Sequence, residues 1–435
     1  MPITAAMRAA LSSEELESGW RLACKAEASG PVVVEIDQWS APVLTDESRL
    51  ALEPVEGLGI AIDLGTTTLV AQLVDLESGE ILAVETALNP QARYGSDVMS
   101  RIQFELAQPG ELRQLIRRSL GGMVAKLAGD RKLREVLIAG NTVMHHLFCG
   151  EDVEPLSRVP FRSPALAGRG FAAQDLEWPV ASELGVRFLP CIGGFVGSDL
   201  LAGLVATGVN EARVSLALLD LGTNGEIAVG CRDEIRCAST AAGPAFEGGR
   251  IRNGMRAGAG AIDRVSRQDD GLECHVIGGG PARGICGSGV VDAVASALDL
   301  GWIDESGRLR RGRAAISLDG VALTQSDIRE LQLAKGAIRA GLDILAGAAE
   351  PSLLLAGAFG NYVRTESARR IGLVPAEAAD VRPAGNTALR GTRMLLLSPS
   401  RRDGIVAGVL GITRHVELAA MPEFQEAFVA RMRLG

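Results

Sequence analysis

Two acidic residues of this sequence each end an apolar run and are followed by glycine and hydroxyl side chains. One such stretch is 63–68 and the other is 220–226. Glycine permits a tight turn and a close approach to the main chain, so backbone N–H groups and hydroxyls can donate to phosphate oxygens. Because a carboxylate beside a phosphate needs a cation between them, we expect Asp63 and Asp220 to hold Mg²⁺ through water. The candidate phosphate-binding residues are Gly65, Thr66, Thr67, Thr68, Gly222, Thr223, Asn224 and Gly225.

The two stretches belong to a larger repeat. Each follows a run typical of a strand buried on both faces, 59–62 or 216–219, and each precedes a strand, a turn and a second strand. An ordinary hairpin turn would explain one copy as well as phosphate binding does, but the repeated meander favours phosphate binding. The sequence therefore predicts two similar half-domains whose turns close on one nucleotide from opposite sides.

Composition excludes several classes of function. The chain has 435 residues, 47% of them hydrophobic and 22% charged, and a net charge of -9. This acidic balance argues against binding to nucleic acid or to an anionic membrane surface. Lysine occurs only at positions 25, 126, 132 and 335, without a Gly-Lys-Ser/Thr motif, which excludes a Walker-A loop. No apolar run approaches the roughly 20 residues of a membrane span, no signal peptide is evident, and CxxC pairs are absent, so we expect a cytoplasmic protein.

Other polar residues follow predicted strands or glycine-rich loops. Asn141 could contact a ligand or cap the helix that follows it. Asp199 opens a helix of small residues, so it could orient an attacking water or only interact with the helix dipole, and Glu226 is the alternative acid for that water. The glycine-rich loop with Gly243 and Glu247 could line the phosphates or the ribose. The turn that could accept a flat ring against its backbone comprises Gly357, Ala358, Phe359 and Gly360.

Five stretches, in order along the chain, resemble the landmarks of the sugar kinase, Hsp70 and actin superfamily (ASKHA). They are the two phosphate motifs, two connecting helices and an adenosine motif, at 63–68, 193–206, 220–226, 353–361 and 385–397. This resemblance implies an α/β fold of duplicated RNase H-like subdomains, the actin-like ATPase fold, with ATP in the cleft between them.

Within this superfamily the chain resembles the reductive activators of corrinoid proteins. The stretches that carry the resemblance are 140–148, 243–248, 284–289 and 327–335. It implies that binding or hydrolysis of ATP drives reduction of a Co(II) corrinoid to Co(I) in a methyltransferase system, with a corrinoid protein as partner. We place Asp327, Gln332 and Lys335 near the ribose or base.

The chain departs from many members of that family in its cysteines. Residues 19–25 resemble the end of a ferredoxin-like [2Fe-2S] domain with Cys24 at its last ligand, but the first three ligands have no counterpart. Because such a cluster needs four cysteines, we expect no iron–sulfur cluster in this chain. Either a separate low-potential protein is the electron donor, or the sequence is a shortened version, or the activity has changed. Activators of 2-hydroxyacyl-CoA dehydratases, a second similar family, carry cysteine where this chain has Ala241. A homodimer is left open.

These observations predict five parts in chain order. They are a remnant of the ferredoxin-like domain (1–37), a linker (38–56), two ASKHA subdomains (57–205 and 206–400) and a helical tail packed on the core (401–435). Within the first subdomain, residues 151–188 are rich in proline and glycine and are expected to be irregular.

Two further functions are compatible with this fold, because fold alone does not fix function. A small-molecule kinase would transfer phosphate to a metabolite. A nucleotide-gated protein-binding module would use ATP without any redox role.

Overall fold

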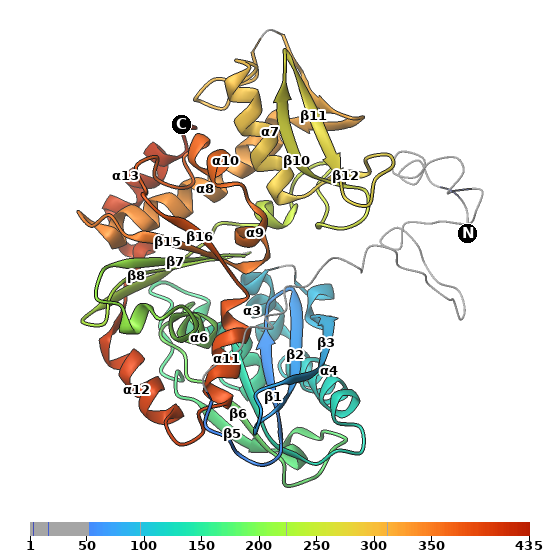
Figure 1. The fold of residues 1–435 in the computed structure, drawn as a ribbon, viewed down its shortest axis with the longest axis vertical. Helices are drawn as coiled ribbons and strands as arrows, with labels where there is room; N and C mark the ends of the chain where they lie inside the picture. The colour runs from blue at the N-terminus through green and yellow to red at the C-terminus, as the bar shows by residue number, and fades with distance from the viewer. Residues whose placement is uncertain (1–2, 4–15, 17–51, 96, 223, 311) are drawn as a thin grey trace. The chain divides into compact units, whose positions relative to one another are not determined.

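The computed structural model describes residues 3, 16, 52–95, 97–222, 224–310 and 312–435. The chain divides between Ser40 and Ala41 into two units. The elements named below belong to the second unit, Ala41–Gly435 (Figure 1). Cys24 and, apart from Ile3 and Leu16, the expected remnant 1–37 lie outside the described residues. Among the described helices, none combines the length and apolar character that a membrane span requires.

Two six-stranded sheets form the framework of the second unit, and five of the six strands in each share one topology. Their strand orders are β3-β2-β1-β4-β6-β5 and β16-β15-β7-β8-β9-β17. In each sheet, a three-stranded antiparallel meander is extended beside its first strand by parallel strands. The strands are β1 (Leu58–Leu64), β2 (Thr68–Asp75), β3 (Ile81–Leu88), β4 (Leu133–Gly140), β5 (Arg169–Ala172), β6 (Gly185–Phe188), β7 (Leu216–Leu221), β8 (Gly225–Gly230), β9 (Ile235–Thr240), β15 (Ser352–Ala356), β16 (Val381–Gly385) and β17 (Thr413–His415). The predicted fold class, with its internal duplication, is confirmed.

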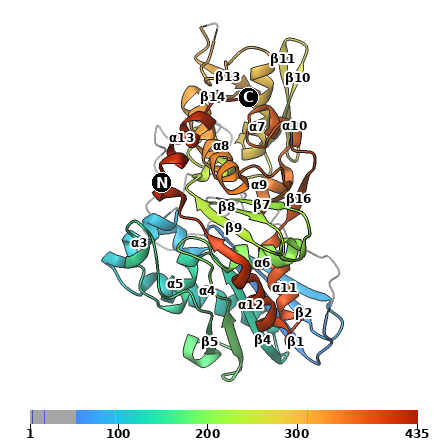
Figure 2. The ribbon, with the colours of Figure 1, turned by 90° about the vertical axis from the view of Figure 1, so that its left-hand side faces the viewer.

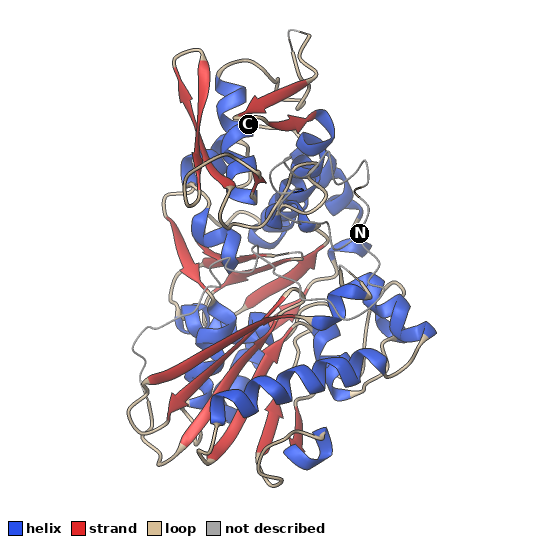
Figure 3. Cartoon of the chain, turned by 90° about the vertical axis from the view of Figure 1, so that its right-hand side faces the viewer, coloured by secondary structure: helices blue, strands red, loops and turns tan. Residues whose placement is uncertain are grey.

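Helices cover both faces of the two sheets (Figures 1 and 2). They are α3 (Val98–Ala107), α4 (Glu111–Ala128), α5 (Thr142–Cys149), α6 (Ser198–Thr207), α7 (Gly287–Asp299), α8 (Gln325–Ala346), α9 (Gly357–Tyr362), α10 (Thr365–Arg370), α11 (Thr387–Leu396), α12 (Arg402–Ile412) and α13 (Pro422–Arg431). Smaller strands, seen in Figure 3, add a three-stranded sheet and a hairpin. These are β10 (Ala261–Gln268), β11 (Gly271–Val276), β12 (Gly284–Ile285), β13 (Ala315–Leu318) and β14 (Val321–Thr324).

The alternation of side chains along the strands builds three hydrophobic layers. In β1, Ile60 and Ile62 face a cluster shared with α3, α4 and α5, while Ala61 faces the opposite side. In β7, Leu218 joins the same middle cluster as Ala61, and Leu219 faces the cluster of α7 and α8. Successive strand residues point to opposite faces, so one apolar run serves two layers. The middle layer, with α6 and α11 in it, therefore lies between the two sheets.

Helices α6 and α11 pack closely because small residues line their contact. A Cβ added to Gly391 would stand 1.9 Å from the carbonyl oxygen of Ala202, which leaves no room for a side chain. A Cβ on Gly203 would stand 3.2 Å from Thr387 Oγ1 in α11. Such close packing fixes how the two helices cross, and both connect one half of the fold to the other.

Two expectations about irregular and helical segments need correction. Residues 151–188 contain β5 and β6, which extend the first sheet beyond β4. Residues 401–435 are not wholly helical, because β17 pairs in parallel with β9 at the edge of the second sheet. In both places a short strand gains its hydrogen bonds from an existing edge, so tertiary pairing decides its structure rather than local pattern.

Candidate active site

Four acidic side chains converge at the start of the two predicted phosphate-binding turns. Residues 63–68 are called the first phosphate turn and residues 220–226 the second. Asp63 lies in β1, Asp220 pairs directly with Glu226 across β7 and β8, and Asp199 lies in the first turn of α6. The charge of at least one other acid raises the pKa of Asp199, Asp220 and Glu226. Burial and then the charge of Asp63 raise the pKa of Asp220 to about 7. Burial, with the charges of Asp220 and Asp63, raises the pKa of Asp199 to about 7 against an opposing hydrogen bond from the Leu200 N–H.

The remaining two acids follow the same pattern. Burial raises the pKa of Asp63 to about 6, although a hydrogen bond from Asn386 opposes this shift. Burial and the charges of Asp199 and Asp220 raise the pKa of Glu226 well above its ordinary value. In the described part of the chain, no arginine or lysine forms an ion pair with any of these four acids. Within the described residues, no cationic side chain therefore offsets the negative charge that these carboxyls carry when they ionise.

The donor set fits a hard divalent cation. Carboxylate oxygens are the ligands that Mg²⁺ prefers, and this ion usually keeps several of its waters. Within the described residues, no three His, Cys, Asp or Glu side chains are arranged to hold a metal ion directly. The carboxylates of Asp63 and Asp220 are thus the residues to consider for a cation held through water.

The first turn contacts two candidate residues from elsewhere in the chain. The Asn141 Nδ2 donates to the Thr66 Oγ1 at 2.8 Å. The Asn141 Oδ1 also accepts from the Met144 N–H at 3.0 Å, so Asn141 caps α5 while touching the turn. The Thr67 hydroxyl donates to Glu247 Oε2 at 3.3 Å, which places the Gly243–Glu247 loop of the second half beside the first turn.

The predicted ring-binding turn lies beside the second turn. Ala356 pairs with Asp220 in the sheet, and a Cβ on Gly357 would stand 2.8 Å from Asp220 Oδ1. Gly357 also has a φ of +79°, so glycine is required here for both space and backbone conformation. Gly222 donates its N–H to the Asn224 carbonyl at 3.2 Å, whereas Thr223 lies outside the described residues.

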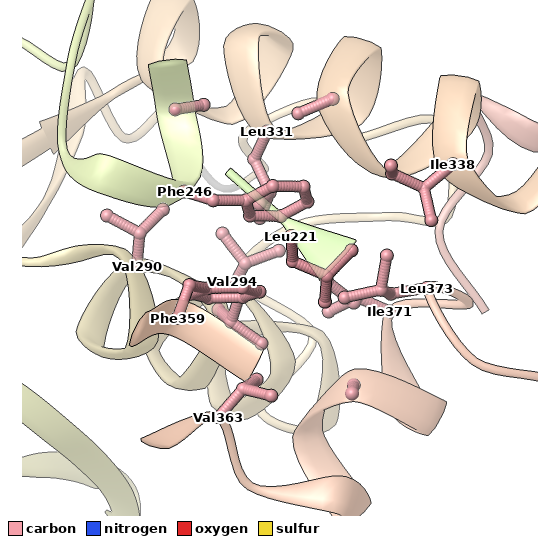
Figure 4. Packing of buried hydrophobic residues seen from close by; sticks show 14 of the residues in the cluster. Leu221, Phe246, Val290, Val294, Leu331, Ile338, Phe359, Val363, Ile371 and Leu373 are labelled. Atoms are coloured by element: carbon pink, nitrogen blue, oxygen red, sulfur yellow. The ribbon is translucent and has the colours of Figure 1, made fainter. Parts of the chain in front are cut away.

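The side chain of Phe359 packs in the core. It is 6% exposed and stacks on Phe246, with ring centroids 4.4 Å apart (Figure 4). Val290, Val294 and Leu331 lie around this pair. Any ligand contact of this turn is therefore left to the backbone of Gly357, Ala358 and Gly360 rather than to the aromatic ring.

Asp327 has a structural set of partners. Its two carboxylate oxygens accept from the backbone N–H groups of Arg252 and Thr324, each at 2.7 Å. The first of these bonds anchors the loop that follows Glu247 to the N-terminus of α8. Asp327 thus holds that loop in place.

Gln332 and Lys335 are directed to the C-terminal tail. The Gln332 Nε2 donates to the Met432 carbonyl at 2.7 Å, and the Lys335 Nζ donates to the Arg433 carbonyl. Burial lowers the pKa of Lys335 to about 7. These contacts favour a role in packing, and a role of either residue beside the ribose or base stays a prediction.

Sequence reasoning missed one side chain that touches the acid cluster. The Asn386 Nδ2 donates to Asp63 Oδ2 at 3.0 Å, and the Asn386 Oδ1 caps α11 by accepting from the Leu389 N–H. Its position before a predicted helix was the available signal, but that signal indicated a cap only. The contact joins the first turn's carboxylate to the helix that connects the two halves.

Comparison with known proteins matches both halves of the chain to one family. Residues 214–435 match the C-terminal domain of RACo, described as the ASKHA domain, and residues 58–212 match the RACo middle region. The chain belongs to the RACo family. The resemblance to reductive activators of corrinoid proteins, drawn from the sequence, is thereby confirmed. The boundaries expected at 37, 56, 205 and 400 stay predictions.

The relatives carry related names. The corrinoid activation enzyme RamQ of Eubacterium limosum is 34% identical over 419 residues, which cover 87% of this chain and 70% of that protein. The [Co(II) methylated amine-specific corrinoid protein] reductase of Methanosarcina barkeri is 31% identical over 415 residues, 86% of this chain and 76% of that protein.

A solved structure, the reductive activator for corrinoid,iron-sulfur protein, superposes on this fold with a TM-score of 0.76 and 31% identity. The match covers 87% of this chain and 66% of that one, so this chain spans slightly less than two thirds of that relative.

Proposed function

We propose that this protein is an ATP-dependent activator of a corrinoid protein, which couples binding or hydrolysis of ATP to reduction of Co(II) corrinoid to Co(I). The observation that carries the proposal is the convergence of Asp63, Asp199, Asp220 and Glu226 beside two phosphate turns, in a chain of the RACo family. The names of its relatives supply the corrinoid partner.

Each half contributes donors and charge to the nucleotide. The backbone and hydroxyl donors of residues 65–68 and 222–225 would bind the phosphates from two sides, and the backbone of 357–360 would accept the adenosine. Mg²⁺, when bound, would neutralise phosphate charge, with Asp63 and Asp220 holding its water ligands. Occupation of that position would lower the pKa of both carboxyls, because a cation favours the charged form.

Asp199 or Glu226 would orient the water that attacks the terminal phosphate. Asp199 is held by the Leu200 N–H at 2.8 Å, and Glu226 accepts from the Ser239 hydroxyl at 3.4 Å. A pKa of about 7 lets Asp199 accept a proton near neutral pH. Catalysis would otherwise rest on positioning and charge neutralisation, as in phosphoryl transfer generally.

The redox step needs one electron for each cobalt. We propose that a separate low-potential protein supplies it and that the corrinoid protein accepts it, so that Co(II) gains the electron and becomes Co(I). This reduction is uphill for ordinary donors. Free energy from ATP would therefore be used to change the surroundings of the cobalt in the complex of the two proteins.

The test measures phosphate release from Mg-ATP with and without a Co(II) corrinoid protein, while the Co(I) absorbance is followed in the presence of a chemical reductant. We expect the partner to accelerate hydrolysis, and Asp220→Asn to abolish both hydrolysis and Co(I) formation. Hydrolysis that responds instead to a metabolite, with a phosphorylated product, would replace this proposal by a kinase. Hydrolysis without any Co(I) formation would leave a nucleotide-gated binding module.

A further inference from the structure

We infer that Arg101 and Asn89 are positioning residues of the first phosphate turn, and that the buried charge of Arg101 strengthens binding of the nucleotide phosphates. The inference rests on the proposed nucleotide site and assigns it two residues that no sequence motif marks. Asn89 follows β3 directly, and Arg101 lies in α3. Both side chains are almost fully buried, at 1% and 0% exposure.

The two residues bind three successive carbonyl oxygens of the turn. The Asn89 Nδ2 donates to the Gly65 carbonyl at 2.9 Å. The Arg101 guanidinium donates to the Thr66 carbonyl at 2.6 Å. The Asn89 backbone N–H donates to the Thr67 carbonyl at 2.9 Å. Every carbonyl of the turn from 65 to 67 is thus held from the protein side.

This arrangement determines where the N–H groups point. In a trans peptide the C=O and the N–H that follows it point in opposite directions. Holding the carbonyls of Gly65 and Thr66 inward therefore turns the N–H groups of Thr66 and Thr67 outward. Among the hydrogen bonds of the described residues, neither of these N–H groups has a protein acceptor. Successive outward N–H groups form the concave backbone site that binds anions.

Arg101 adds charge to this geometry. Its other contacts are with neutral acceptors, the Gly95 carbonyl at 3.0 Å and Gln91 Oε1 at 3.3 Å. The charge of Asp97 raises the pKa of Arg101, but burial has the larger effect and lowers this pKa to about 10. The guanidinium remains charged at neutral pH and is shielded from water. A desolvated cation directly behind the turn attracts phosphate more strongly than a solvated one would.

The experiment compares nucleotide affinities of Arg101→Met and Arg101→Lys with that of the wild type by titration calorimetry. We expect Arg101→Met to bind Mg-ATP about 10- to 100-fold more weakly, because the phosphates lose their attraction to a charge that is shielded from water. The loss should be much smaller for AMP, which lacks the β- and γ-phosphates. Arg101→Lys keeps the charge and should recover most of the affinity.

Arg117→Met is the matched control, because Arg117 donates to the Phe148 carbonyl at 2.8 Å in the same half without touching the turn. A merely structural role of Arg101 would lower the melting temperature and the fraction of binding-competent protein, as in the control, while the Kd of the folded fraction stayed unchanged. That result would overturn the inference.

Two further outcomes distinguish a failure of the proposed function from a failure of the inference. If the wild type does not bind Mg-ATP at all, the proposed function fails and the inference falls with it. If the wild type binds and Arg101→Met does not fold, Asn89→Ala and Arg101→Gln, which keeps an N–H donor but no charge, decide. A larger loss of affinity for ATP than for AMP in these two variants, each relative to wild type, supports the inference, and wild-type affinities in both overturn it.

Discussion

The charge of Asp220 should destabilise the folded protein when no nucleotide is present. Burial and the charge of Asp63 raise the pKa of Asp220 from 3.8 to about 7, a difference of about 3 units. At about 1.4 kcal/mol per unit, the ionised side chain lowers the free energy of unfolding by about 4 kcal/mol at pH 8. Because Asp220 keeps partial access to solvent, we expect Asp220→Asn to raise the free energy of unfolding by about 2 to 4 kcal/mol.

The pH dependence follows from the same shift. As pH rises from 3.8 to about 7, the unfolded chain loses a proton at Asp220 that the folded chain retains. Folding therefore becomes less favourable across this window and is insensitive to Asp220 above it. The asparagine variant cannot ionise at this position. Its advantage over the wild type should be largest at pH 8 and should shrink towards zero as the pH approaches 4.

Urea denaturation of the nucleotide-free protein, in chelator and at several pH values, measures this difference. Asp403→Asn is the control, since Asp403 is 84% exposed in its surface ion pair with Arg187. We expect that variant to change stability by less than about 0.5 kcal/mol at every pH. If Asp220→Asn were no more stable than the wild type at pH 8, or if its advantage did not shrink with falling pH, the electrostatic reasoning would be wrong.

Three other outcomes test the packing around the site. Gly391→Ala should lower the free energy of unfolding by about 3 kcal/mol, because its Cβ clashes with the Ala202 carbonyl. Gly385→Ala is the control: its φ is +73° but an added Cβ would have no atom within 4 Å, so it should cost only about 1 kcal/mol. Equal losses in urea titrations would contradict the close contact between the helices. A double-mutant cycle of Thr67→Val and Glu247→Ala should give a coupling of about 1 kcal/mol in the free energy of unfolding, and zero coupling would mean that the contact is absent in solution. Lys335→Met should leave the Kd for Mg-ATP within about twofold, because the Lys335 Nζ donates to the Arg433 carbonyl of the C-terminal tail; weaker binding would instead support a nucleotide role.

The local chemistry of the two turns was predictable from sequence. Asp63 and Asp220 follow apolar runs that suit buried strands, and the repeat of the whole meander indicated that both turns belong to one kind of site. Both acids prove to belong to one electrostatic cluster with Asp199 and Glu226. The part of the site that depends on one strand and the turn after it could therefore be predicted from the sequence.

The directions in which side chains point were harder to predict from the sequence than the chemistry of the turns. Phe359 was a candidate for ring binding because it lies in a glycine-rich turn, yet its ring packs on Phe246 in the core. A burial this deep depends on what stands across the fold, and one aromatic residue in a turn carries no periodicity to reveal it. The contact of Arg101 could not be predicted for the same reason, since its guanidinium donates to the Thr66 carbonyl, 35 residues earlier in the chain.

Contacts between the two halves of the fold were the hardest to predict from the sequence. Asn386 donates to Asp63 across 323 residues, and Thr67 donates to Glu247 across 180. The Asn386 contact depends on how α6 and α11 pack, because Asn386 caps α11, and Gly203 and Gly391 leave room for these two helices to approach. The polar residues that meet at the site are thus brought into register by small residues that carry no chemistry. A change in how these two helices pack would move Asn386 relative to Asp63, so the carboxylate that would hold the cation and the connection between the halves are mechanically linked.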